Sequence, residues 1–121
     1  MSVTVTDTKN SSGEIDFNLF NKADGFPDDA TKAFKHVRGK ISNGKCSVTF
    51  QNLPFGEYAI IIYHDANSNN KCDETWYGMP KEGVGISNNP SLGAFRPPSF
   101  EKGKFSLNKT EQTTSISIIY L

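Results

Sequence analysis

The chain has 121 residues, with thirteen basic and thirteen acidic side chains and therefore no net charge. A chain of this length is expected to form a single domain, residues 1–121, that buries about two-thirds of its unfolded surface. The balanced charge and the lack of a Lys/Arg run exclude the electrostatic basis of non-specific nucleic-acid binding. The longest apolar run, Tyr58 to Tyr63, is far shorter than the roughly 20 residues that span a bilayer, so no membrane insertion is predicted.

The first part of the chain predicts two strands and a short helix. Ser2 to Thr8 alternates Val with Thr, and Glu14 to Phe20 alternates apolar with polar residues, the period-two pattern of half-buried strands. Asn21 to Pro27 has loop composition. A helix is expected from Asp28 to Ala33, because acidic residues at a helix N-terminus complement the helix dipole.

A β-hairpin is predicted next. Phe34 to Ile41 and Lys45 to Phe50 flank Ser42-Asn43-Gly44. Asn-Gly is the strongest short hairpin signal, since both residues tolerate positive φ. We therefore expect these two segments to pair with each other.

The second half of the chain is organised around a long polar stretch. Tyr58 to His64 is apolar on both faces, as a central strand requires. It leads directly into the polar stretch Tyr63 to Asn89. Pro90 to Glu101 reads as irregular chain, and strands are expected at Phe105 to Leu107 and Thr113 to Leu121.

These elements predict an all-β fold. About seven short strands, frequent turn signals and no recurring amphipathic helix favour an antiparallel β-sandwich of immunoglobulin-like or transthyretin-like type.

Two cysteines, Cys46 and Cys72, have a spacing that matches no metal or redox motif. They could form one disulfide, or Cys46, which alternates with Val48 and Phe50, could be a small core residue. Met1-Ser2 runs straight into the first strand without the regions of a signal peptide. The sequence thus fits a cytosolic protein or an exported domain whose leader is missing.

Four segments of the chain carry a family resemblance. They are FNKADGFP at 20–27, LPFGEY at 53–58, HDANSN at 64–69 and GMPKEGVGISNN at 78–89. In this order the chain resembles the bacterial family catalogued as domain of unknown function 2141. The resemblance implies an exported β-sandwich, periplasmic or extracellular, that is made with a signal peptide, and it implies no reaction. Ile86 stands where an aromatic residue is expected.

The start of the polar stretch suggests a calcium site. Asp65, Asn67 and Asn69 recur at every second residue, and Lys71, through its backbone carbonyl, and Asp73 could follow as ligands, as in an EF-hand loop. Trp76 stands where an EF-hand has its bidentate Glu, so weak binding is expected. The alternative is a metal-free loop, since Asp and Asn also fold back onto their own backbone. A transition metal at His64 is a poorer alternative, because no Cys or second His lies close to it in sequence.

A second group of residues offers a surface for a protein, peptide or glycan partner. Flat rings beside polar groups are common in such sites. The candidate residues are His64, Trp76, Tyr77, Glu82, Ser87, Asn88 and Asn89. The alternative is structural: Gly78, Gly83 and Gly85 would permit tight turns, and the serine and asparagines would cap neighbouring strands.

Catalysis is the least favoured hypothesis. A hydrolase would centre on His64 with Glu82, but adjacent strand residues point to opposite faces, so His64 and Asp65 cannot act as a pair. We therefore expect a non-enzymatic module without a cofactor other than calcium.

Overall fold

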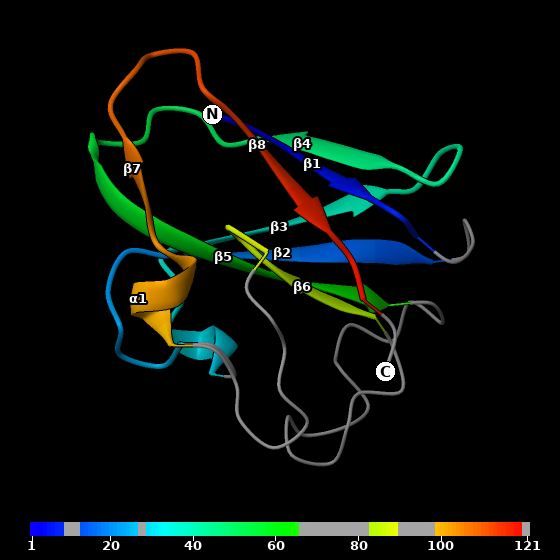
Figure 1. Ribbon diagram of the computed structural model, residues 1–121, viewed down its shortest axis with the longest axis horizontal. Helices are drawn as coiled ribbons and strands as arrows, with labels where there is room; N and C mark the ends of the chain where they lie inside the picture. Colours follow the sequence, from blue (N-terminus) through cyan, green and yellow to red (C-terminus); the bar gives the residue numbers. More distant parts are fainter. Residues whose placement is uncertain (9–12, 27–28, 66–82, 90–98, 120–121) are drawn as a thin grey trace.

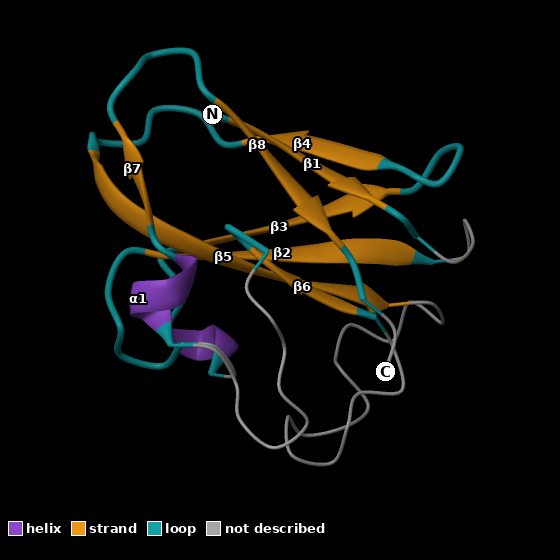
Figure 2. Ribbon diagram, in the orientation of Figure 1, coloured by secondary structure: helices purple, strands orange, loops and turns teal. Residues whose placement is uncertain are grey.

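The computed structural model describes residues 1–8, 13–26, 29–65, 83–89 and 99–119. Two β-sheets pack against each other as the layers of a sandwich, which confirms the predicted fold class (Figure 1). In the described residues, helical structure is limited to short segments beside the larger sheet (Figure 2). The immunoglobulin-like or transthyretin-like assignment stays a prediction.

The smaller sheet has the strand order β4-β1-β8. Its strands are β1 (Ser2–Thr6), β4 (Cys46–Thr49) and β8 (Thr113–Ser117). β1 pairs with β4 in antiparallel orientation, but with β8 in parallel orientation. The expectation of a wholly antiparallel sandwich is therefore wrong at this pair. Parallel neighbours need a long connection, and almost the whole domain lies between β1 and β8.

The larger sheet has the order β3-β2-β5-β6, and β7 also pairs with β5. Its strands are β2 (Glu14–Phe20), β3 (Lys35–Lys40), β5 (Gly56–Asp65), β6 (Val84–Ile86) and β7 (Phe105–Leu107). β5 is the central strand that its apolar sequence predicts. β6 lies inside the stretch predicted as a polar loop, since three residues are too few to show a periodic pattern.

The predicted hairpin is wrong in its pairing, although its turn is present. Asn43 and Gly44 have φ of 54° and 76°, and Ser42 and Lys45 exchange backbone hydrogen bonds of 2.8 and 3.1 Å. Beyond that bridge, however, β3 pairs with β2 and β4 pairs with β1, in different sheets. The Asn-Gly pair forms the turn, but it does not determine which strands the flanking segments pair with.

The chain changes sheets at this corner, and side chains of β4 pack tightly against the backbone of β3. A Cβ at Gly39 would lie 2.7 Å from the Cys46 Sγ and 2.8 Å from the Val48 Cγ1. On the other side of the sandwich, an isolated bridge joins Val84 of β6 to Ile119, just after β8. One side of the sandwich is thus closed by side chains packed on Gly39, and the other by backbone pairing.

The main core lies between the two sheets. The alternating residues predicted to face inward are buried, including Val3 and Val5 of β1 and Ile15, Phe17 and Leu19 of β2. Ile60 and Ile62 contribute from β5, and Ile116 from β8. Cys46 is a buried free thiol in this core, as its alternation with Val48 suggested; Cys72 lies outside the described residues.

A second, smaller cluster covers the outer face of the larger sheet. Phe20, Ile61, Val84 and Ile86 form it. The ring of Phe26 makes edge-to-face contacts with the rings of Phe20 and Phe100, with centroid distances of 5.2 and 5.9 Å. Short helices lie here, η1 (Ala30–Lys32) and α1 (Phe100–Gly103). The helix predicted from Asp28 to Ala33 is thus only one 3₁₀ turn, and α1 begins in chain expected to be irregular, where the Ser99 hydroxyl caps the Lys102 N–H.

Within the described residues, no helix is long and apolar enough to cross a membrane.

Candidate functional site

The polar stretch leaves and re-enters the larger sheet at adjacent positions. β5 ends at Asp65, and the antiparallel strand β6 begins at Val84. The His64 N–H donates to the Gly83 carbonyl at 2.9 Å, which continues the β5–β6 ladder to the last described residues on each side. We call Asp65, His64 and Gly83 the stem. Its backbone is held at hydrogen-bond distance between the central strand β5 and the edge strand β6.

Most predicted ligands lie beyond this stem. Seven of the residues predicted for the calcium site or the ligand surface fall outside the described residues: Asn67, Asn69, Lys71, Asp73, Trp76, Tyr77 and Glu82. The structure describes His64, Asp65, Ser87, Asn88 and Asn89.

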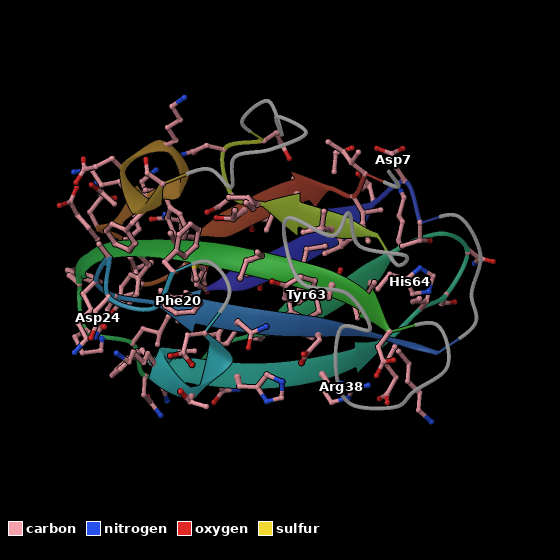
Figure 3. The ribbon with its side chains drawn as sticks, turned by 90° about the horizontal axis from the view of Figure 1, so that it is seen from below. Asp7, Phe20, Asp24, Arg38, Tyr63 and His64 are labelled. Atoms are coloured by element: carbon pink, nitrogen blue, oxygen red, sulfur yellow. The ribbon has the colours of Figure 1, made fainter. Side chains whose placement is uncertain are left out.

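Asp65 lies on the outer face of the larger sheet and is paired with a cation. Its Oδ2 is 2.6 Å from Arg38 Nη2, and only 2% of its side chain is exposed. Arg38 comes from β3 and also lies 3.3 Å from Glu14 Oε1 and 3.7 Å from Asp16 Oδ1. Figure 3 shows Arg38 and Tyr63 on this face. One guanidinium therefore joins three carboxylates across β3, β2 and β5.

The pKa of Arg38 reflects this environment. Burial by itself lowers it, but the hydrogen bond to Asp65 and the negative charges of Asp16, Asp65 and Glu14 outweigh burial and raise it. The guanidinium stays charged at every ordinary pH. Its positive charge stabilises the carboxylate at the end of β5.

His36 extends the same network towards solvent. Its Nε2 contacts Asp16 Oδ1, and about half of its side chain is exposed. We refer to Glu14, Asp16, His36, Arg38 and Asp65 as the charged cluster. The sequence does not predict this cluster, although the alternation of β2 does put Glu14 and Asp16 on one face. Only the cross-strand register brings β3 and β5 beside them.

His64 lies on the opposite face of β5 from Asp65. It continues the alternation of Ile60 and Ile62, which face the main core, and it is 1% exposed. Asp65 instead points to Arg38 on the outer face. The expectation that these neighbours cannot act together as acid and base agrees with this geometry.

Ser87, Asn88 and Asn89 act as connectors at the other end of β6. The buried Ser87 hydroxyl accepts the Ile60 N–H at 2.9 Å and donates to the Gly103 carbonyl at 2.5 Å. The Asn88 amide donates to the carbonyls of Lys102 and Lys104.

Asn89 makes the corresponding link to the smaller sheet. Its Oδ1 accepts the Ser117 N–H at 2.8 Å. Asn88 and Asn89 have φ of 69° and 47°, a left-handed backbone that Asn tolerates better than most residues. This segment therefore fastens β6 to α1 and to β8.

No metal cluster is formed by the part of the chain that the structure describes. Within it, no group of three or more His, Cys, Asp or Glu side chains could hold an ion. Asp65, the predicted first calcium ligand, already forms an ion pair with Arg38. An ion at Asp65 would have to share its carboxylate with that guanidinium.

A pocket of about 450 Å³ opens at the opposite end of β5 from the stem. Met1, Phe50, Leu53, Phe55 and Leu107 supply its apolar walls. Its lining includes none of the site residues predicted from the sequence.

Comparison with known protein families identifies the family of this chain. The model of a family described as an uncharacterised protein conserved in bacteria, DUF2141, matches residues 3–115. No curated protein and no solved structure matches the chain.

Proposed function

The chain belongs to the bacterial DUF2141 family, and from that premise we propose that it is a non-enzymatic, exported binding module that presents residues 66–82 to a partner. The partner would be a protein, a peptide or a glycan. The proposal rests on the construction of the stem.

The stem supports the proposal because a backbone hydrogen bond and a buried ion pair hold it to the larger sheet. Binding residues are commonly found on loops that a rigid scaffold positions. Here the scaffold is the central strand of the larger sheet, and the last residue before the loop is a buried carboxylate held by Arg38. A buried charge is retained only with good pairing, since desolvating it costs several kcal/mol.

Calcium is the ion that this loop would take. The alternating Asp65, Asn67, Asn69 and Asp73 supply the oxygen ligands that calcium prefers. Because Arg38 competes for Asp65, we expect a dissociation constant in the millimolar range of extracellular modules.

Thermal unfolding with and without calcium tests this role. At a calcium concentration of about ten times the dissociation constant, mass action adds about 1.4 kcal/mol to the stability of the native state. We expect the melting temperature to rise in calcium relative to EDTA. The rise should be lost in Asp73→Ala and kept in Asn43→Ala, a loop substitution far from the stem in sequence. Equal melting curves in EDTA and in calcium at about 10 mM would refute the calcium role.

Recognition by the loop is tested separately through its Trp. Trp76 is the single Trp of the chain, so its fluorescence reports on this loop alone. We expect a saturable change with members of a peptide and glycan panel, and none in Trp76→Phe. If the protein binds calcium but the fluorescence of Trp76 does not change with any member of the panel, the calcium site stands and the binding role is refuted.

A further inference from the structure

Most sheet edges of the sandwich are protected against pairing with another strand, as exposed edges in natural proteins usually are. β3, at one edge of the larger sheet, is protected by charge, since four of its six residues are basic: Lys35, His36, Arg38 and Lys40. On the other side of the sandwich, Ile119 exchanges backbone hydrogen bonds of 2.9 and 2.8 Å with Val84. The Asn89 side chain accepts the N–H of Ser117. These contacts occupy parts of the edges of β6 and β8.

β4, the remaining edge of the smaller sheet, lacks such protection. It carries no charge and no proline. Reciprocal backbone hydrogen bonds of 2.8 Å join Met1 and Phe50, so the backbone groups of Phe50 face β1. Because this direction alternates along an antiparallel pair, the N–H and C=O groups of Val48 also face β1, and those of Ser47 and Thr49 face away from it. Both residues are exposed, and no described residue bonds to these outward backbone groups.

The inner side of β4 is covered by β3. A Cβ at Gly39 would lie 2.7 Å from Cys46 Sγ and 2.8 Å from Val48 Cγ1, so both side chains pack against the β3 backbone. β3 is the last strand of the larger sheet, and a strand added outside β4 would lie beyond it. An isolated peptide there would have inward side chains that the larger sheet does not cover. The β4 strand of a second copy, by contrast, brings its own β3 as cover.

We propose that β4 pairs in antiparallel orientation with β4 of a second copy of the chain, about a twofold axis at Val48. Ser47 of each copy then lies opposite Thr49 of the other, and each of these two pairs exchanges two backbone hydrogen bonds, four in all. The two Val48 side chains lie directly opposite each other on the inner face, where β-branched pairs are favourable. Lys45 lies opposite Gln51, so the register places no like charges opposite each other. This proposal does not depend on residues 66–82 or on calcium.

The proposed contact is small, because each copy contributes one strand of four residues. Lys35 and Lys40 are exposed on the neighbouring β3, and the pairing brings the two copies of that strand towards each other. We therefore expect a weak, reversible dimer rather than an obligate one.

Sedimentation equilibrium of the full chain, from about 10 μM to about 1 mM, tests the proposal. We expect a monomer–dimer equilibrium. Thr49→Pro removes an outward N–H, which an edge strand tolerates, and with it two of the four bonds, so the dissociation constant should rise about tenfold or more. Ser115→Pro is the matched control on β8, the opposite edge of the same sheet: its N–H, like that of Ser117, points away from β1, and the dissociation constant should not change. A melting curve confirms that each variant is folded.

Charged variants test the register independently, and they replace Thr49→Pro if that variant is unfolded. Ser47→Lys combined with Thr49→Lys puts like charges opposite each other across the axis, and so does Ser47→Glu combined with Thr49→Glu. We expect each double variant alone to be monomeric at about 0.15 M salt, and their mixture to form the dimer.

Several results would overturn the proposal. One is a protein that stays monomeric at about 1 mM, and others are equal losses in Thr49→Pro and Ser115→Pro or a mixture of the charged variants that stays monomeric. A dimer that Phe55→Ser dissociates and Thr49→Pro does not would place the contact at the exposed Phe55 beside the pocket. A monomer that binds a synthetic peptide of residues 45–51 would assign the β4 edge to an extended peptide instead.

Discussion

The outer faces of the two sheets differ in chemistry although their strands alternate in the same way. The larger sheet turns carboxylates and a guanidinium outward, and Asp65 and Arg38 are largely removed from water. The smaller sheet turns only hydroxyls outward, and Ser47, Thr49 and Ser115 are exposed. Buried charge depends on its partners, whereas exposed hydroxyls exchange freely with water. Substitutions should therefore be costly on the first face and nearly silent on the second.

The largest effect is expected from breaking the ion pair of the charged cluster. Arg38→Met leaves Asp65 as a buried carboxylate without its cation, and such a change costs about 3–5 kcal/mol. Urea unfolding measures this loss. Lys32→Met is the matched control, since its pair with Asp24 is exposed on both sides and should contribute no more than about 1 kcal/mol. If the two variants lose equal stability, the cluster is not a buried network.

A further variant sharpens this result. Arg38→Met combined with Asp65→Leu removes both members of the most buried pair and leaves Glu14 and Asp16, whose side chains are more exposed than that of Asp65, so much of the lost stability should return. A double variant as unstable as Arg38→Met alone would mean that packing of the Arg38 side chain, rather than its charge, stabilises the fold.

The next largest effect is expected from the Cys46 thiol, which lies in the core between the two sheets. Burial, with a smaller contribution from the charge of Glu14, raises the pKa of Cys46 from 9.0 to about 11. Because the thiolate is disfavoured in the folded state, this contribution to stability is complete below pH 9 and is lost as the pH rises through about 11. The loss should amount to about 2–3 kcal/mol.

The measurement is urea unfolding between pH 8 and 11 in a Cys72→Ser background, which leaves a single thiol. Cys46→Ala in the same background should remove this part of the pH dependence. An unchanged slope would show that Cys46 ionises as readily in the native state as in the unfolded chain.

The smallest effect is expected from two serines, one buried beside the larger sheet and one exposed on the smaller sheet. Ser87→Ala removes the hydroxyl that satisfies the Ile60 N–H and bonds to Gly103, and an unsatisfied buried donor costs about 1–3 kcal/mol. Ser115→Ala, at an exposed position of β8, should change stability by less than about 0.5 kcal/mol. Chemical denaturation of both variants decides this. Equal losses of stability in the two variants would show that the buried Ser87 hydroxyl contributes no more than the exposed Ser115 hydroxyl.

Local pattern predicted much of the fold. The alternation of Val3 and Val5, or of Ile15, Phe17 and Leu19, identified strands and their buried faces, because the period of a strand is a property of the chain itself. The Asn43-Gly44 turn was predicted because both residues tolerate positive φ, which is also a local property of the chain. Short elements such as β6, η1 and α1 were missed or misplaced, since three or four residues carry too little periodic signal.

The candidate site was only half predictable. The position of Asp65 at the end of a central strand follows from the run Tyr58 to His64, and the opposite orientation of His64 follows from alternation. Arg38 could not be assigned to Asp65, because they are 27 residues apart and meet only through β2, which pairs with both of their strands.

By itself the sequence determined which residues are strand-forming, which of them face inward, and that the chain belongs to a family marked by its polar loop. Tertiary structure alone decided which strands are neighbours. It separated β3 from β4, set β8 parallel to β1, and brought Arg38 to Asp65. The physical reason is that alternation fixes the face of each side chain, whereas pairing partners and register depend on the packing of the whole core.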